Sequence, residues 1–473
     1  MTPFDEHIIK SLLTTKGPSG TVEDILTWVM RRNREVVVKI NPVPFKALAN
    51  WGFDATTGNL CHESGKFFSI EGVHVVVDDG CRREWTQPII NQPEIGFLGI
   101  VAKEIDGVLC FLLQAKIEPG NVNHVQLSPT LQATRSNYTQ VHRGRRPRYL
   151  EYFQNAKKSQ VVLDQLQSEQ GARFLRKRNR NIILFVAEDV PLSEDFKWLT
   201  LGQIKALINH DNIVNMDTRT VISGLLYHRF FEGLPQGHFE QLMQRHEVHT
   251  FGRDLFVSEM ALAGERTIDE VLFWLSELKS KYELLVDRIA LKAVKEWRIT
   301  KDEIVRSDRQ YFRVLGVEVI IDNREVRSWC QPLVEPMQEG LCAFVIKKIR
   351  GVYHFLVQAK IECGNFDVVE MAPTVQCLTG RYKGENAVSP PFLEFVLAAS
   401  EERIIFDTQQ SEEGGRFYHE QNRNLLVEAD DSFSVQVPEN FMWLTLGQIK
   451  EFLRFNNYLN IQARSLIAAL DYR

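Results

Sequence analysis

The sequence predicts an α+β fold that occurs twice, with strands followed in each half by the helices that pack on them. The segment QAKIEPGN at 114–121 recurs as QAKIECGN at 358–365, and LTLGQIK at 199–205 recurs unchanged at 444–450. This spacing is far longer than the roughly 20–50 residues of a solenoid repeat. The 473 residues also exceed the length of roughly 250–300 at which a single core stops growing. We therefore expect two like domains, namely a first repeat at 1–227, a connecting segment at 228–262 and a second repeat at 263–473.

The elements of the two repeats are expected in the same order. A helix should begin after Thr21 and after Thr267, because each threonine is followed three residues later by an acid and then by apolar residues at helical spacing. Strands are expected at 68–77 with 312–321, 98–105 with 343–349, 108–117 with 352–361, and 182–186 with 425–427. Amphipathic stretches lie at 149–166 and 392–399. The basic run near Arg178 is expected to cap an element or cross the surface, and LTLGQIK should begin the last helix.

Composition excludes several classes of protein. The chain is 44% hydrophobic and 25% charged, as in ordinary globular domains. The N-terminal residues lack the apolar core of a signal peptide, and no apolar run approaches the roughly 18 residues of a membrane span. Seven cysteines without a CxxC pair favour reduced thiols over disulfides or a zinc site. A net charge of −5 argues against a generally nucleic-acid-binding surface. A cytoplasmic protein with neither a membrane nor a nucleic-acid partner is expected.

The repeated strand at 108–117 ends in polar residues on one face. Because side chains alternate along a strand, Gln114, Lys116 and Glu118 should point the same way, as should Gln358, Lys360 and Glu362. A solvent-exposed strand end with a Lys–Glu pair would give the same pattern. Since both copies keep all three residues, we favour the floor of a ligand pocket.

A cationic loop follows this strand in the first repeat only. No acidic residue occurs between Glu118 and Glu151, whereas five arginines do, among them Arg135 and Arg143. Arginine offers bidentate donors that suit a diphosphate. A solvated basic loop or an RNA-binding patch remains an alternative for the RGRRPR cluster. Arg135 and Tyr138 are stronger candidates, because they directly follow the repeated SPTLQ segment.

Tryptophan precedes Gln-Pro in both repeats, at Trp85 and Trp329. Either ring could stack on a nucleobase, although a tryptophan at a strand end is more often part of the core. The sequence contains no GxGxxG, GxxxxGK[ST], HExxH or GxSxG motif, and its twelve histidines have no metal-ligand spacing. A reaction without a cofactor is therefore favoured.

Together, QAKIEPGN, QLSPTLQATRSNYTQVHRG and the duplicated WxQP and LTLGQIK elements resemble the nucleotide-diphosphate-hexose 2,3-dehydratase family over nearly the whole chain. The resemblance implies two tandem Nudix-like domains, a homodimer, and no metal or nicotinamide. It implies action on dTDP-4-keto-6-deoxy-D-glucose in the synthesis of 2,6-dideoxy sugars for antibiotics and surface polysaccharides. It also implies that one of the two pockets is a relic of the duplication. No intact Nudix box is present.

The implied reaction suits acid–base groups alone. The C3 proton is acidified by the C4 ketone, the C2 hydroxyl leaves when protonated, and the resulting enol tautomerises to a 3,4-diketo sugar. The catalytic candidates are Lys116, Glu118, Tyr138 and His142. The substrate-binding candidates are Trp85, Gln87, Gln114, Asn121, Ser128, Thr130, Gln132, Arg135, Ser136, Asn137 and Arg143. The candidates for the second pocket are Trp329, Gln331, Gln358, Lys360, Glu362, Asn365, Glu370, Thr374, Gln376, Arg381 and Tyr382.

Two other functions compete with this one. A Nudix-like hydrolase of sugar nucleotides would need a helical cluster of glutamates for its metal, which the sequence does not show. A non-catalytic nucleotide- or RNA-binding protein would use the basic loop, and its RNA binding would depend steeply on salt. If the chain is the dehydratase, a 3-ketoreductase is expected to act on its product.

Overall fold

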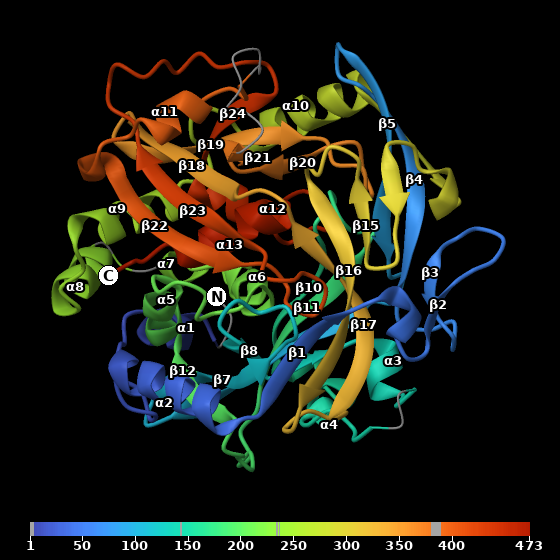
Figure 1. Cartoon of the computed structure of the whole chain (residues 1–473). Coiled ribbons are helices and arrows are strands. Elements are labelled where there is room, and N and C mark those ends of the chain that lie inside the picture. Colours follow the sequence, from blue (N-terminus) through green and yellow to red (C-terminus); the bar gives the residue numbers. More distant parts are fainter. Residues whose placement is uncertain (1–3, 142–143, 233–234, 236, 380–388) are drawn as a thin grey trace.

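The computed structural model describes residues 4–141, 144–232, 235, 237–379 and 389–473. Within them the strands form two seven-stranded and two five-stranded sheets, with helices between the large sheets and around them (Figure 1).

The two seven-stranded sheets have the same topology. The first has the order β10-β11-β6-β7-β12, with β8 on β7 and β9 on β6, and the second has the order β22-β23-β18-β19-β24, with β20 on β19 and β21 on β18. The expected duplicated α+β arrangement is thus confirmed. The strands of the first are β6 (Gly96–Ile105), β7 (Val108–Ile117), β8 (Val125–Pro129), β9 (Leu131–Ala133), β10 (Val161–Ser168), β11 (Arg178–Phe185) and β12 (Phe196–Thr200). Those of the second are β18 (Gly340–Ile349), β19 (Val352–Lys360), β20 (Glu370–Ala372), β21 (Val375–Leu378), β22 (Ile404–Ser411), β23 (Gln421–Glu428) and β24 (Phe441–Thr445).

Each five-stranded sheet contains one strand from the other repeat. Strand β1 pairs with β16 from Val38 opposite Ile321 to Val43 opposite Gly316, so the blue strand lies beside the yellow one in Figure 1. Strand β13 pairs with β4 in the same way. One sheet comprises β1 (Val38–Val43), β14 (Trp297–Ile299), β15 (Glu303–Arg306), β16 (Phe312–Ile321) and β17 (Ser328–Pro336). The other comprises β2 (Trp51–Phe53), β3 (Leu60–His62), β4 (Ser69–Asp78), β5 (Arg82–Asn91) and β13 (Glu283–Ile289).

The helices expected from capping signals are present. The side chain of Thr21 accepts from the Asp24 amide while Asp24 accepts from the Thr21 amide, and Thr267 with Glu270 repeats this capping box. The first repeat has α1 (Asp5–Leu12), α2 (Val22–Glu35), α3 (Arg135–Tyr138), α4 (Leu150–Gln154), α5 (Leu201–Ile208) and α6 (Met216–Ser223). The remainder are α7 (His228–Phe231), α8 (His238–Arg245), α9 (Thr250–Met260), α10 (Ile268–Lys281), α11 (Leu393–Leu397), α12 (Leu446–Phe452) and α13 (Ile461–Ala469).

The described part of the connecting segment at 228–262 is largely helical, and its last helix has a counterpart in the first repeat. In α1, the Ser11 hydroxyl donates to the Leu109 carbonyl and accepts from the Leu201 amide. In α9, Ser258 makes the same two contacts with Tyr353 and Leu446. Helix α9 therefore packs on the second repeat as α1 packs on the first. The proposed domain limits at 227 and 263 remain a prediction.

Two expectations from the sequence were wrong. The basic run near Arg178 does not cross the surface but forms β11, which is buried between β6 and β10 with Asn179 and Asn181 inside. The amphipathic stretch at 149–166 is not continuous, because α4 ends at Gln154 and β10 begins at Val161. In both places pairing with neighbouring strands outweighs the local pattern.

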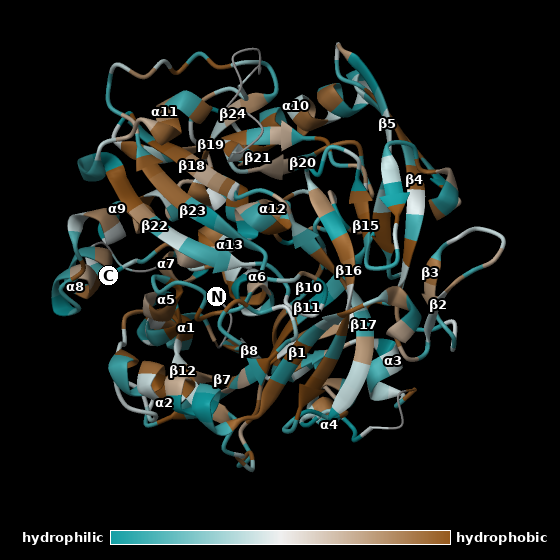
Figure 2. Cartoon of the chain, in the orientation of Figure 1, coloured by the Kyte–Doolittle hydropathy of each residue, from teal (hydrophilic) through white to brown (hydrophobic). Residues whose placement is uncertain are grey.

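The core lies on both faces of the large sheets. In β7, Leu109, Phe111 and Leu113 belong to the large cluster shared with the helices, whereas Cys110 and Leu112 face a separate cluster. Figure 2 shows long hydrophobic stretches along β18 and β23 in the other large sheet. Burial on both faces holds the polar end of β7 in a fixed position.

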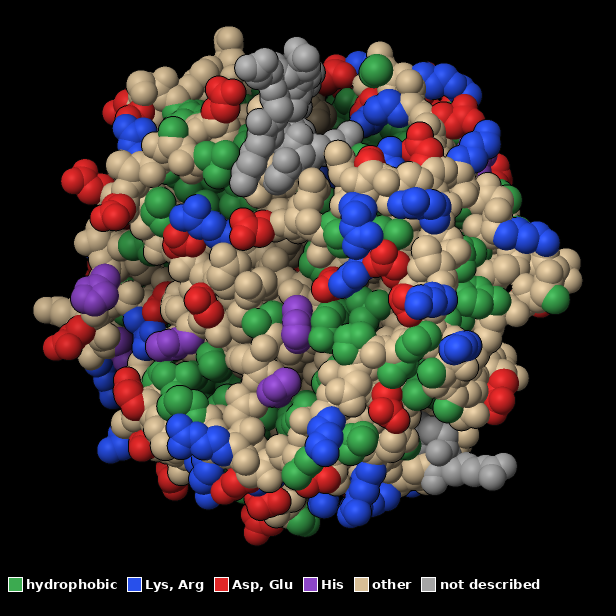
Figure 3. All heavy atoms as spheres, viewed as in Figure 1, with side chains coloured by type: hydrophobic (Ala, Val, Ile, Leu, Met, Phe, Trp, Pro, Cys, Tyr) green, Lys and Arg blue, Asp and Glu red, His purple; other side chains and the backbone are tan. Residues whose placement is uncertain are grey.

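The surface carries both signs of charge. On the face in Figure 3, lysine and arginine side chains are interspersed with acidic ones. This mixture accords with the small net charge of −5. Among the described helices, none combines the length and apolar character that crossing a membrane requires.

Candidate functional site

A cavity of about 800 Å³ lies where the end of β7 meets segments of the second repeat. Its volume is within the roughly 300–1,000 Å³ that small-molecule sites occupy. The polar residues that line it from the first repeat are Asn50, His62, Glu63, Ser64, Gln92, Lys116, Glu118, Gln132, Thr134, Asn137, Glu169, Lys177, Asn179 and Asp217. Those from the second repeat are Glu318, Arg324, Glu325, Ser328, Trp329, Gln331, Glu413 and Arg416. The cavity is therefore built jointly by both repeats.

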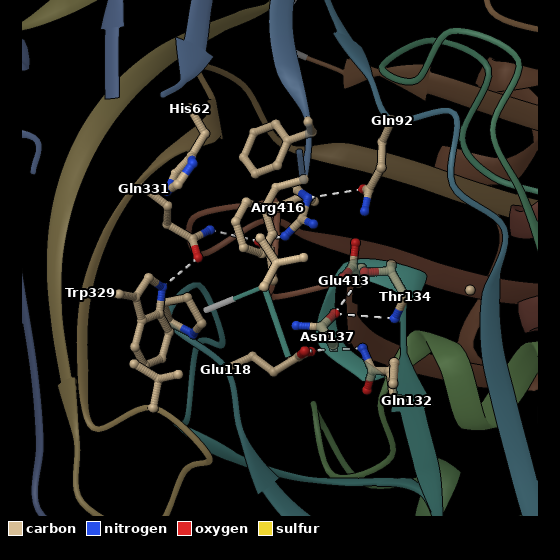
Figure 4. Close-up of a pocket in the computed structure, with 18 of the residues that line it drawn as sticks. His62, Gln92, Glu118, Gln132, Thr134, Asn137, Trp329, Gln331, Glu413 and Arg416 are labelled. Atoms are coloured by element: carbon tan, nitrogen blue, oxygen red, sulfur yellow. Dashed lines mark hydrogen bonds between the residues drawn. The ribbon is translucent and has the colours of Figure 1, made fainter. Parts of the chain in front are cut away.

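A buried ion pair forms part of the lining. The Lys116 ammonium lies 3.4 Å from Glu118 Oε1, and their side chains are only 8% and 6% exposed. Gln132 Nε2 donates to the same oxygen at 3.0 Å, as Figure 4 shows. Burial lowers the pKa of Lys116, and the nearby Glu118 opposes that effect. The other oxygen, Glu118 Oε2, is buried without a hydrogen-bond partner among the described residues. The carboxylate thus retains an unused acceptor beside the cavity.

The facing wall comes from β17 and from the segment between β22 and β23. Trp329 Nε1 donates to Gln331 Oε1 at 2.7 Å, and Gln331 Nε2 donates to the Gly415 carbonyl at 2.8 Å. Arg416 Nε donates to Gln92 Oε1 at 3.1 Å. Figure 4 shows these side chains around the same space as Glu118 and Gln132. An indole and a guanidinium on one wall suit an aromatic, anionic ligand such as a nucleoside diphosphate.

Three of the other carboxyl groups that line the cavity have a raised pKa, at Glu169, Asp217 and Glu413. Burial raises the pKa of Glu413 to about 7 and the pKa of Asp217 well above its usual value, and neighbouring carboxylates add to both effects. Burial also raises the pKa of Glu169, while the nearby Lys177 opposes the increase. Perturbed titratable groups gathered in one cavity are typical of catalytic sites.

The arginine that the sequence favoured for binding the diphosphate does not line the cavity. Arg135 is exposed and is not among the residues that line the cavity. Arg324 lines it instead, with its Nη1 donating to the Ile117 carbonyl at 2.6 Å and its guanidinium 6.0 Å from the centre of the Trp329 ring. Lys177 adds a second cation, and burial lowers its pKa to about 8.

Several predicted first-pocket residues have structural contacts elsewhere. Tyr138 packs on Phe97, with ring centres 6.0 Å apart, and does not line the cavity. Thr130 donates to the Leu112 carbonyl, Ser128 accepts from Asn215, and Ser136 bonds to Glu94. Asn121 donates to the His124 carbonyl, and Gln114 lies half-buried within β7. His142, Arg143, Arg381 and Tyr382 lie outside the described residues.

The second repeat has an equivalent arrangement. Gln376 Nε2 donates to Glu362 Oε1 at 3.0 Å, as Gln132 does to Glu118, and the Lys360 ammonium donates to the Gln376 carbonyl at 3.2 Å. The hydroxyl of Thr374 donates to the Leu356 carbonyl, and Asn365 is buried. Glu370 accepts from Ser168 of the first repeat at 2.8 Å. Gln358 occupies in β19 the position that Gln114 has in β7.

The predicted grouping of the Trp-Gln pairs was wrong. Trp329 and Gln331, which were expected in the second pocket, line the cavity with Lys116 and Glu118. Trp85 packs near Cys363 of the second repeat, beside the turn that follows β19. The reason is that each hairpin reaches the other repeat's turn, since Arg324 between β16 and β17 donates to the Ile117 carbonyl and β4–β5 packs on Cys363. Whether any of these residues binds a ligand remains a prediction.

Sequence reasoning missed Glu169, Lys177, Asp217 and Glu413. A signal for Glu413 was present, because SEEGGRF at 411–417 matches SEQGARF at 168–174 except at the third and fifth residues, and the third is Glu413. Comparing the two copies position by position would have revealed this carboxyl group.

The model of a family described as NDP-hexose 2,3-dehydratase matches residues 22–225 and 268–470. A dTDP-4-dehydro-6-deoxy-alpha-D-glucopyranose 2,3-dehydratase of Saccharopolyspora spinosa is 47% identical over 444 residues, which cover 94% of this chain and 90% of the relative. An enzyme of the same name from Amycolatopsis orientalis is 42% identical over 474 residues, covering 99% and 94%. Another from Streptomyces violaceoruber is 42% identical over 446 residues, covering 94% and 95%.

Proposed function

This chain belongs to the NDP-hexose 2,3-dehydratase family, and we propose that it dehydrates dTDP-4-keto-6-deoxy-D-glucose at the cavity that contains Lys116 and Glu118. It is a sugar-nucleotide 2,3-dehydratase. The observation that carries the choice of site is the buried Lys116–Glu118 pair beside a cavity of about 800 Å³. A carboxylate and an ammonium held together in this way are the groups that removal of a proton next to a ketone requires.

The proposed reaction begins at C3 of the sugar. Glu118 takes the C3 proton through its free oxygen, and the Lys116 ammonium stabilises the negative charge that develops on the C4 oxygen. The C2 hydroxyl then leaves as water when an acid protonates it. The enol that remains gains a proton at C2 and loses one from the C3 oxygen, which yields the 3,4-diketo-2,6-dideoxy sugar. Tyr138 receives no role, because it lies outside the cavity lining.

The test is direct incubation. The protein is mixed with dTDP-4-keto-6-deoxy-D-glucose and a 3-ketoreductase, which traps the unstable diketone, and the sugars are analysed by mass. With the nicotinamide reductant of the ketoreductase present, we expect a trapped product that has lost one water and gained two hydrogens, and that carries deuterium at C2 when the reaction runs in D₂O. An unchanged sugar nucleotide, or free dTMP from cleavage of the diphosphate, would contradict the proposal.

Arg324 is expected to hold the diphosphate. Arg324→Ala should weaken dTDP binding by about 1.5–3 kcal/mol, the range for a hydrogen bond to a charged group. Arg135→Ala, at the exposed residue that the sequence favoured, should weaken it much less. Isothermal titration of each variant with dTDP measures the difference. A larger loss of dTDP affinity for Arg135→Ala than for Arg324→Ala would indicate that the basic loop binds the diphosphate.

Several expectations from the sequence remain proposals. They are a Nudix-like ancestry of the repeats, a homodimer, a reaction without a cofactor, a cytoplasmic location, a downstream 3-ketoreductase and a place in antibiotic synthesis. Full activity after dialysis against EDTA is the expected result for a metal-free reaction.

A further inference from the structure

The two repeats build equivalent sites by exchanging the same parts. At the first site, the Gly120 amide donates to the Gly414 carbonyl at 2.7 Å. At the second, the Gly364 amide donates to the Gly171 carbonyl at 2.6 Å. Each turn after the polar strand is therefore closed by the segment that follows β10 or β22 of the other repeat. Residues of the two sites can consequently be compared position by position.

The two sites differ in their ionisable side chains at equivalent positions. Glu413 in the segment at the first site corresponds to Gln170 at the second, since both stand directly before the closing glycine. Asp217, in the first turn of α6, corresponds to Gln462 in the first turn of α13. The second site has carboxyl groups of its own at Glu370 and Glu420, but they are at other positions. An amide cannot exchange a proton as a carboxyl group does, so the sites differ in acid–base capacity.

Glu413 faces the buried ion pair. A β-carbon placed on Gly415 would lie 2.6 Å from Glu413 Oε1 and 3.3 Å from Glu118 Oε1, so both oxygens border the same small space. Both residues also line the cavity. Figure 4 shows Glu413 near Asn137, on the same side of the cavity as Gln132. Two carboxyl groups from different repeats thus meet where the sugar would lie.

The electrostatics favour different protonation of the two groups. Burial raises the pKa of Glu413 to about 7, Arg416 lowers it, and the charge of Glu118 raises it. Glu118 instead lies 3.4 Å from the Lys116 ammonium. A general acid must release and regain its proton in every turnover, which suits a group that titrates near neutrality. Asp217 suits this less, because its pKa is raised well above the usual value and its side chain is nearly fully buried.

We propose that Glu413, which the second repeat contributes, is the general acid that protonates the departing C2 hydroxyl. This inference rests on the proposed function. Glu118 takes the C3 proton, the electrons of that bond form the enolate, and the C2–O bond breaks as the Glu413 proton joins the oxygen to give water. The Glu413 carboxylate then takes the proton of the C3 oxygen, and Glu118 protonates C2 after its own proton has exchanged with solvent. Both groups end as they began.

The test is Glu413→Gln, which gives the first site the residue that the second site has. We expect kcat for dehydration to fall at least about 100-fold, the usual effect of a positioned acid. Binding of dTDP should change little. The variant should still exchange the C3 proton of the substrate with D₂O, because Glu118 is intact, whereas a base variant would not. Glu413→Asp should be more active than Glu413→Gln, and it provides a second variant if the amide impairs folding.

Glu71→Gln is the matched control, because it changes a buried carboxyl group that pairs with Arg288 on β13 and does not line the cavity. It should leave kcat unchanged. The wild-type rate should fall as pH rises through about 7, where Glu413 loses its proton, and Glu413→Gln should lack this decline. Near-normal turnover in Glu413→Gln, or loss of C3 exchange together with turnover, would overturn the acid role. Failure of the wild-type protein to dehydrate the substrate would instead overturn the proposed function.

Discussion

Glu118→Gln is expected to lower kcat for dehydration by about 10²–10⁴-fold, the range for removal of a positioned general base. The amide keeps the size of the side chain and can still accept from Gln132. It cannot take the C3 proton, and it leaves the buried Lys116 without its counter-ion. Single-turnover rates measured by rapid quench and mass analysis would show the loss. The C3 proton of bound substrate should also stop exchanging with D₂O.

The equivalent substitution in the second repeat is the comparison. Glu362→Gln alters the same hydrogen bond, with Gln376, at the other site. It is expected to lower turnover far less than Glu118→Gln. If Glu362→Gln proved the more damaging, the chemistry would belong to the second site and the assignment would be reversed.

The second large effect concerns stability. Glu259→Gln is expected to lower the free energy of unfolding by about 3–5 kcal/mol, because it leaves a buried lysine without its partner. Glu259 is fully buried and lies 2.8 Å from the Lys450 ammonium, which is itself 2% exposed. It also accepts from the Tyr227 amide at 2.6 Å and from the Tyr472 hydroxyl. These contacts tie α9, α12 and the C-terminal residues together.

Chemical denaturation followed by circular dichroism measures this loss. Glu439→Gln removes the partner of Lys281 in an exposed pair and should lower the stability much less than Glu259→Gln does. Glu259→Gln combined with Lys450→Met should recover much of the stability, since no unpaired charge remains. Equal stability of the wild type and Glu259→Gln would show that the Glu259–Lys450 pair does not stabilise the packing of α9 against α12.

The strands that the sequence predicted are those with a clear apolar pattern. β4, β6 and β7 were found together with their counterparts, because buried strands and repeated segments give strong signals. β11 was predicted only from Ile182 onward, because the basic residues at its start lack the apolar pattern of a strand, although they pair in parallel with β6. Arg180 is accommodated there by a hydrogen-bonded pair with Asp164 on β10. The local sequence pattern around Arg180 cannot reveal a partner on a neighbouring strand.

The candidate site was predicted only in part. Lys116 and Glu118, which the strand pattern suggested, line the cavity together with Gln132 and Asn137, whereas Gln114, Arg135 and Tyr138 do not. The facing wall of the cavity comes from the other repeat. Because the two repeats are alike, the sequence is equally compatible with a hairpin that packs on its own repeat and with a hairpin that packs on the other repeat. Only the pairing of β1 with β16 and of β13 with β4 distinguishes these arrangements.

The exchange of strands also determines how the two sites can diverge. In a symmetric pair of separate, identical chains, any substitution would appear at both sites at once. Here the copies are joined in one chain, so Glu413 and Gln170 are encoded independently although they stand at equivalent positions. One site can therefore lose an ionisable group while the other keeps it. Yet neither copy can be removed, because each supplies a wall to the site of the other.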